Sequence, residues 1–221
     1  MALATVVAWL ETIETPALLI DIGSTTTDLT SLDQGRVVAR GRTDTERLVT
    51  QELLYAGVRR TPLCALATEL PFRGQNTGLA AELFATTLDI YLTIGEVPEA
   101  QSDLATADGR PATIGRARDR LARMVGADRD GFTSDDAWVL SQTIDQMLVA
   151  RIEAAARRSC LPTIGHPHMV VVAGSGEFLA RRVASRLVDE TKIVSLSQLW
   201  GSAASDAACA HAVVRLAKEL G

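Results

Sequence analysis

Short apolar runs near the start of the chain predict the strands of a sheet. Residues 17–22 (ALLIDI) read as a fully buried strand, and Gly23 ends it. Residues 28–33 alternate polar and apolar positions, as a half-buried strand does. After a Gln-Gly turn at residues 34–35, residues 36–41 (RVVARG) read as a third strand. The three segments together predict an antiparallel meander.

Helical spacing of apolar residues dominates the middle of the chain. Thr43 or Asp44 can cap a helix that carries Leu48, Leu53 and Leu54 on one side. Three further segments are predicted to be largely helical: residues 79–95, 113–125 and 134–159. Glycine and proline punctuate two segments that are predicted to be loops: residues 56–78 and 98–112.

The last quarter of the chain alternates strands and helices. The predicted elements are a strand at 169–173, a helix at 176–188, a strand at 192–196 and a helix at 203–219. A meander followed by crossover units implies a mixed sheet, and the helices are expected to cover it. The sequence therefore predicts an α/β fold with a helical insertion.

Composition narrows the class of protein. The chain has 221 residues, of which 47% are hydrophobic, so it can bury a real core. A net charge of −5 and the absence of a basic block argue against a nucleic-acid partner. Three separated cysteines suggest a reduced, cytoplasmic protein. The apolar residues 1–10 lack a basic flank and are too short to span a membrane, so we expect a surface or interface helix.

A hydroxyl-rich turn follows the first strand, in the segment LLIDIGSTTTDL. Its four consecutive hydroxyl residues, between two aspartates, are Ser24, Thr25, Thr26 and Thr27, flanked by Asp21 and Asp28. Backbone N–H groups and hydroxyls can cradle a phosphate, and Gly23 lets the backbone approach it closely. The aspartates suit such a site if a magnesium ion stands between carboxylate and phosphate. The alternative is a hairpin turn whose aspartates satisfy backbone donors.

A glycine turn late in the chain adds to this picture. Residues 169–180 (MVVVAGSGEFLA) place Gly174, Ser175 and Gly176 between a strand and a helix, where a nucleotide can lie against the backbone. An Asp-Gly hairpin followed by a strand with Gly-x-Gly about 150 residues on resembles the second half of the actin/hexokinase/Hsp70 fold. That resemblance implies a ribonuclease H-like lobe that binds ATP or ADP.

Several segments resemble one family. DIGSTTTDL, TDTERLVTQELLYAGVRRTPLCA, ELFATTLDIYLTIGEVPE and TADGRP are similar to the hydantoinase A/oxoprolinase-like family, most of all to its branch of the tetrahydromethanopterin-linked one-carbon transfer pathway. The resemblance covers about residues 17–215. It implies methanofuran biosynthesis, in which an aminomethylfuran diphosphate is joined to a phenol or amine acceptor with release of diphosphate. Other relatives imply ATP-dependent hydrolysis of an amide or cyclic imide.

One departure from the family pattern sets a further expectation. Family members begin with another glycine-rich phosphate hairpin, which this chain lacks, so residues 1–16 are expected to be the tail of a preceding lobe or an interface helix. Residues 17–221 would form the second lobe, with an insertion at about 56–160. The alternative function is then a nucleotide-binding subunit that is inactive without a partner chain, or that self-associates.

Three arginines and two acids complete the predicted site. Arg59 and Arg60 can clamp a departing diphosphate, or they can be solvated surface residues. Glu52 can act as a general base or as a salt-bridge partner. Asp108 and Arg110 flank a turn glycine in TADGRP. A turn alone explains Asp-Gly, whereas the family resemblance implies a substrate or metal loop.

Overall fold

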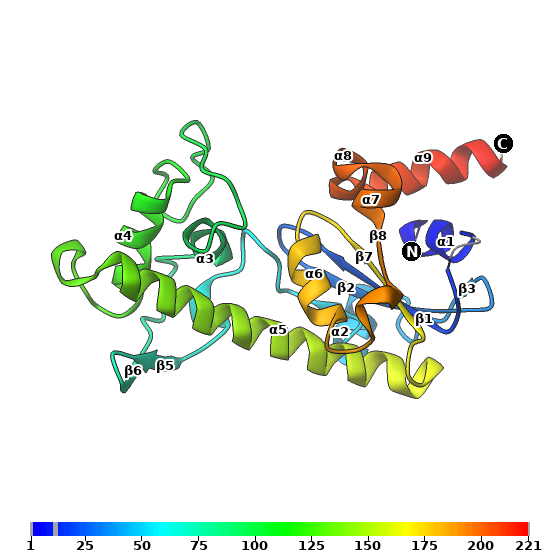
Figure 1. Cartoon of the computed structure of the whole chain (residues 1–221), viewed down its shortest axis with the longest axis horizontal. Helices are drawn as coiled ribbons and strands as arrows, with labels where there is room; N and C mark the ends of the chain where they lie inside the picture. The colour runs from blue at the N-terminus through cyan, green and yellow to red at the C-terminus, as the bar shows by residue number, and fades with distance from the viewer. Residues whose placement is uncertain (1, 11–12, 221) are drawn as a thin grey trace. The chain divides into compact units, whose positions relative to one another are not determined.

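The computed structural model describes residues 2–10 and 13–220, and the chain divides into two compact units (Figure 1). Unit 1 comprises residues 1–55 and 149–221, and unit 2 comprises residues 56–148. The hydroxyl-rich hairpin and the glycine turn both belong to unit 1.

Unit 1 is built on a mixed sheet. Its strands are β1 (Ala17–Ile22), β2 (Thr27–Asp33), β3 (Arg36–Val37), β4 (Leu53–Leu54), β7 (Met169–Ala173) and β8 (Ile193–Ser195). Their order is β3-β2-β1-β7-β8, with β4 paired to β2. β1 runs antiparallel to β2 and parallel to β7, and β7 is parallel to β8. The predicted mixed sheet is therefore confirmed.

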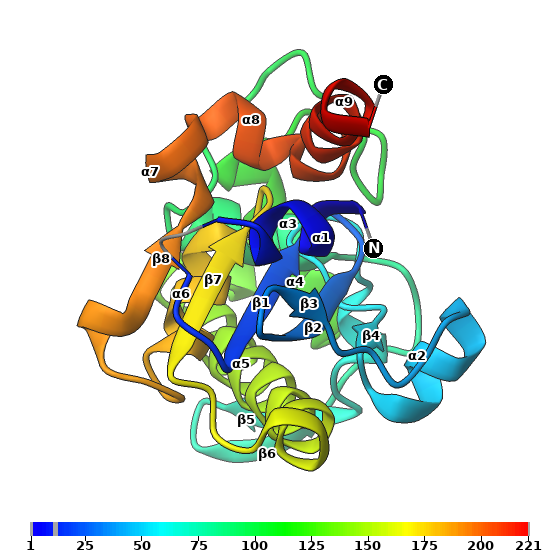
Figure 2. The ribbon, with the colours of Figure 1, turned by 90° about the vertical axis from the view of Figure 1, so that its right-hand side faces the viewer.

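Helices cover both faces of this sheet. α1 (Ala2–Ala8) and α9 (Ala208–Leu220) pack on one face, where Val7 and Ala212 share a core with Leu19 of β1. Figure 2 shows α6 (Glu177–Ala184) behind the sheet, on the face opposite α1. Because side chains alternate along a strand, odd-numbered β1 residues face α1 and α9, and Asp21 shares that face.

The predicted third strand is too long. β3 ends at Val37, and although Val38 N still donates to Ser31 O at 2.8 Å, the next backbone donors leave the sheet. Arg40 N and Gly41 N each donate to the carboxylate of Glu52 at 2.7 Å. The buried carboxylate of Glu52 therefore accepts the hydrogen bonds that a neighbouring strand would otherwise accept from residues 40 and 41.

The predicted helix after Gly41 is confirmed at its start and wrong at its end. Thr43 caps α2 (Asp44–Thr50) in a capping box with Glu46. The helix stops because Gln51 adopts a left-handed conformation with φ of 62°, and Leu53 and Leu54 then pair with β2 as β4. The three leucines therefore do not share a helix face.

The predicted helix at 203–219 is divided at Ala207, where one short helix ends before α9 begins, and a further short helix that was not predicted precedes both. α7 (Leu196–Trp200) and α8 (Ser202–Asp206) precede α9, and a short 3₁₀ turn, η3 (Glu190–Lys192), precedes β8. Gly201, with φ of +87°, separates α7 from α8. Such a backbone conformation suits glycine and breaks a helix.

Unit 2 is mainly helical. Its elements are η1 (Leu63–Ala65), β5 (Glu69–Phe72), β6 (Gln75–Gly78), α3 (Thr87–Thr93), α4 (Ile114–Met124), η2 (Arg129–Gly131) and the first half of α5 (Ser134–Ile164). The predicted helix at 79–95 is confined to α3, because Leu79 N and Ala80 N donate to distant carbonyls and the Thr86 capping box starts the helix later. The β5–β6 hairpin was not predicted.

None of the helices described in residues 2–10 and 13–220 is long and apolar enough to cross a membrane.

The hydrogen bonds of Glu52 are expected to stabilise the fold. Glu52 is 2% exposed and also accepts a hydrogen bond from Thr50 Oγ1 at 2.6 Å. We expect Glu52→Gln to lower the free energy of unfolding by roughly 2–3 kcal/mol, because the amide N–H₂ faces backbone donors. Urea unfolding measures the change. Glu82→Gln, at an exposed site, is the matched control, and equal stability of both variants would refute the anchoring role.

Candidate functional site

The parallel strands β1, β7 and β8 end at one edge of the unit 1 sheet, and the predicted phosphate hairpin lies there. Crevices outside the carboxyl ends of such strands are common ligand sites in α/β proteins. Gly23 N donates to Thr26 O at 2.9 Å, which closes a tight turn, and Ser24 Oγ lies 3.3 Å from Thr25 Oγ1. Thr27 is buried in β2. Three of the four hydroxyls therefore lie in the turn itself.

The two predicted metal ligands face each other. Asp21 pairs with Asp28 across β1 and β2, so both side chains lie on the same face of the sheet. Burial, and secondly the nearby charge of Asp28, raise the pKa of the Asp21 carboxyl to about 6. A carboxylate in this position is destabilised until a positive charge joins it.

The neighbours of the two aspartates differ. Arg47 of α2 forms an ion pair with Asp28, with 2.8 Å between Nη2 and Oδ1. The Asp21 carboxylate lies 3.7 Å from the thiol of Cys209, whose own pKa is raised by burial and by the charges of Asp21 and Asp28. Asp21 therefore has no cationic side chain against it among the described residues. This asymmetry fits a site for a cation.

The described residues offer no group of three or more His, Cys, Asp and Glu side chains that could hold a metal ion. A magnesium ion held here would take one or two carboxylates, with phosphate and water completing its shell, as is usual for this metal. Asp21 and Asp28 fit that mode of binding, and a ligand set made of protein alone is not needed.

The predicted glycine turn packs directly against Asp21. Gly174 has φ of +90°, and a Cβ at this position would lie 2.3 Å from Ile22 O and 2.5 Å from Asp21 Oδ1. Gly176 N donates to Ile22 O at 2.8 Å, while Ser175 is exposed. The structure thus brings the glycine turn, the hairpin and Asp21 together in unit 1.

Sequence reasoning missed a polar cluster that supports the turn. The carboxylate of Glu177, in the first turn of α6, accepts hydrogen bonds from the hydroxyls of Ser195, Ser197 and Ser205. Ser205 Oγ also accepts a hydrogen bond of 3.3 Å from Gly174 N. The glutamate directly after Gly-Ser-Gly could have indicated a polar cluster at this turn. Its serine partners lie 18 to 28 residues away in sequence, so spacing could not identify them.

The other predicted residues fall in different places. Glu52 lies in unit 1, where its carboxylate holds the backbone of residues 40–41. The remaining four lie in unit 2. Arg59 forms an ion pair of 2.5 Å with Asp103, and Arg60 is exposed. Arg110 N donates to Asp108 Oδ1 at 3.2 Å, so these two residues share one loop.

A buried ion triad fixes that loop of unit 2, and sequence reasoning missed it. Arg120 of α4 is fully buried and contacts Asp89 at 2.7 Å and Asp108 at 3.0 Å. Burial raises the pKa of Asp89 to about 6 despite the Arg120 charge. At Asp108 burial acts upward too, but hydrogen bonds from Arg110 N and Arg120 lower the pKa overall. The triad holds Asp108 in a defined orientation.

The raised pKa of Asp21 predicts a pH-dependent stability. The folded state holds the proton up to about pH 6, whereas an unfolded aspartate releases it near 3.8. Stability is therefore lost as pH rises through this window, by up to about 3 kcal/mol. We expect Asp21→Asn to raise the melting temperature at pH 7.5 and to lose this advantage near pH 4.

Thermal unfolding across this pH range makes the measurement. Asp206→Asn on α8 is the matched control, because Asp206 is exposed to solvent. An Asp21→Asn variant that is less stable than the wild type at pH 7.5 would show that the carboxylate is not destabilised in the fold.

Known proteins give independent information on this chain. The model of a family described as hydantoinase/oxoprolinase matches residues 3–218. A protein of Methanocaldococcus jannaschii, named (4-{4-[2-(gamma-L-glutamylamino)ethyl]phenoxymethyl}furan-2-yl)methanamine synthase, is 32% identical over 210 residues. A protein of the same name from Methanococcus vannielii is 28% identical over 214 residues.

The extent of these matches differs between the relatives. The match covers 93% of this chain and 60% of the M. jannaschii protein, and 94% of this chain and 93% of the M. vannielii protein. The family match includes both units and every predicted site residue. The chain belongs to the hydantoinase/oxoprolinase family.

Proposed function

We propose that this chain is a magnesium-dependent enzyme of methanofuran biosynthesis that forms an aryl ether with release of diphosphate. The relatives' name describes a phenoxymethyl group on a furan, which is an ether between a phenol and a furan methylene. In the proposed reaction the phenol oxygen of the acceptor attacks the methylene carbon of an aminomethylfuran diphosphate. The bond from that carbon to the diphosphate breaks, diphosphate leaves with the electron pair, and the phenol proton is released.

The observation that carries the proposal is the facing pair of aspartates, of which Asp28 pairs with Arg47 while Asp21 has no cationic side chain beside it in the described part of the chain. In this proposal Asp21 and Asp28 hold magnesium, which neutralises the diphosphate when bound. The turn hydroxyls of Ser24, Thr25 and Thr26 donate to the phosphate oxygens. The neighbouring turn at Gly174 to Gly176 keeps the backbone close to Asp21.

In unit 2 we propose that Arg59, Arg60, Asp108 and Arg110 serve the substrates. Guanidinium groups bind the anionic parts of substrates through charge-assisted hydrogen bonds. Arg60 is exposed, and the Arg110 side chain is 53% exposed, so both can reach a ligand. Glu52 is already bonded to two backbone amides and a hydroxyl, so no step is assigned to it.

The family description favours a second candidate function. A hydantoinase/oxoprolinase would use ATP to activate an amide or cyclic imide, and the same hairpin and glycine turn would then hold the nucleotide. We propose that unit 1 is the second lobe of an actin-like ATPase fold in either case. A further alternative is a nucleotide-binding lobe that acts only with a partner chain.

Titration calorimetry with magnesium separates these functions. We expect the wild type to bind diphosphate in a magnesium-dependent manner, and Asp21→Asn with Asp28→Asn to weaken binding at least tenfold. Binding of ATP in preference to diphosphate would favour the amidohydrolase. Mass spectrometry of reactions with an aminomethylfuran diphosphate and a phenol then tests ether formation directly.

The Asp206→Asn variant again serves as the control, because it removes one carboxylate from an exposed position of the same unit. Undiminished magnesium-dependent binding by the double variant would refute the proposed metal site. A folded wild type that binds neither diphosphate nor ATP in the presence of magnesium would refute a self-sufficient site and favour the partner-dependent alternative.

A further inference from the structure

Unit 2 contains a cavity that the proposed function does not use. It has a volume of about 410 Å³ and lies between the end of α3, the first half of α4, η2 and the start of α5. Its size falls within the range of small-molecule sites. Ile114 and Arg118 of α4 line it one helical turn apart, as do Ser134 and Trp138 of α5.

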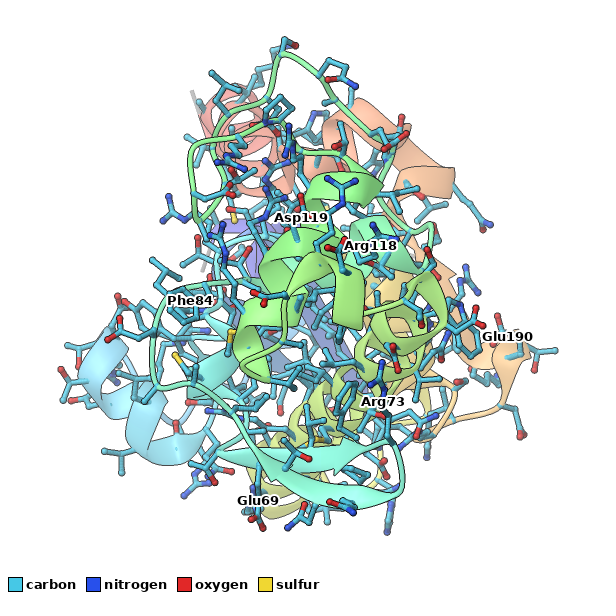
Figure 3. All side chains as sticks on the ribbon, turned by 90° about the vertical axis from the view of Figure 1, so that its left-hand side faces the viewer. Glu69, Arg73, Phe84, Arg118, Asp119 and Glu190 are labelled. Carbon is cyan, nitrogen blue, oxygen red and sulfur yellow. The ribbon has the colours of Figure 1, made fainter. Side chains whose placement is uncertain are left out.

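Arg118 brings a positive charge to this cavity. Its contact is a hydrogen bond of 3.4 Å from Nη1 to Ser134 Oγ, and its Nε is buried without a hydrogen-bond partner. Within residues 2–10 and 13–220 it forms no ion pair. Figure 3 views the side of unit 2 on which Arg118 and Asp119 lie, and both come from α4. A buried donor of this kind favours an anionic ligand.

Trp138 adds a flat apolar surface. Trp138 is 52% exposed, and it lines the cavity together with Ile114. Aromatic rings in such positions stack on ligand rings. The cavity thus combines a guanidinium group with an aromatic wall.

Neither backbone conformation nor packing requires glycine at position 115. It lies in the first turn of α4, its φ is not positive, and a Cβ would meet no atom within 4 Å. Glycine costs a helix roughly 0.5–1 kcal/mol relative to alanine. Because Gly115 lines the cavity, its missing side chain leaves volume that a ligand can occupy.

Two guanidinium groups and one carboxylate lie at the cavity. Arg129 also lines it, but its Nε lies 3.4 Å from Asp119 Oδ1, so its charge is partly matched. Asp135 contributes one negative charge. Of the two guanidinium groups at the cavity, that of Arg118 is the one that forms no ion pair among the described residues, and it is therefore the one available to an anion.

We propose that this cavity binds a small aromatic anion, with the carboxylate or phosphate on Arg118 and the ring against Trp138. Gly115 leaves room for the ring. This site is independent of the Asp21–Asp28 site and of the reaction proposed above, so either can fail without the other.

Tryptophan fluorescence with two probes tests the proposal. We expect 4-hydroxybenzoate or phenyl phosphate to change the emission saturably, with a dissociation constant of roughly 1 mM or below. The two probes distinguish a carboxylate site from a phosphate site. Phenol and benzamidine, which lack the negative charge, should not bind. Trp138→Phe should abolish the fluorescence response, which separates this residue from Trp9 and Trp200.

Two variants and one control complete the test. Arg118→Gln should weaken binding at least tenfold, whereas Arg123→Gln, at an exposed position of the same helix outside the cavity, should bind like the wild type. Gly115→Leu should block binding without lowering the melting temperature, because leucine is a good helix former. No saturable binding of either anion, or wild-type binding by Arg118→Gln or Gly115→Leu, would overturn the proposal.

Discussion

The burial of the Asp21 carboxylate beside Asp28 is the constraint on which the candidate site depends. The register of β1 and β2 places the two carboxylates side by side, and Arg47 compensates only the second of them. A fold that keeps a buried carboxylate without a counterion gives up stability at that point. Such an arrangement is typical of a site that a ligand completes, and the neighbouring hydroxyl turn and glycine turn fit a phosphate with its cation.

The surrounding structure keeps that carboxylate in place. Gly174 touches both Asp21 and the backbone of Ile22, and no larger residue would fit without displacing one of them. The hydroxyl of Ser205 accepts a hydrogen bond from Gly174 N and donates one to Glu177, so α8 stabilises the glycine turn. In unit 2 the fully buried Arg120 plays a comparable part by holding Asp108. Both supports come from residues distant in sequence.

The mixed sheet and the candidate hairpin could be predicted because they depend on local patterns. Residues 17–20 and 169–173 are continuous apolar runs, and Asp21 and Asp28 flank a short hydroxyl turn. The predictions failed where a non-local acceptor replaced the local one. The backbone N–H groups of residues 40 and 41 donate to Glu52, and Leu79 N and Ala80 N donate to distant carbonyl groups. The serines around Glu177 and the triad around Arg120 were missed because only tertiary packing brings them together.

The raised pKa of Asp21 also has a thermodynamic consequence for any cation that binds there. Below about pH 6 the carboxyl carries a proton that the incoming ion must displace, so binding is coupled to proton release. Apparent affinity then rises with pH, and the heat measured near pH 5.5 includes the heat of ionisation of the buffer that takes up the proton. Buffers with different ionisation enthalpies would therefore yield different apparent enthalpies, and their slope would count the protons released from the site.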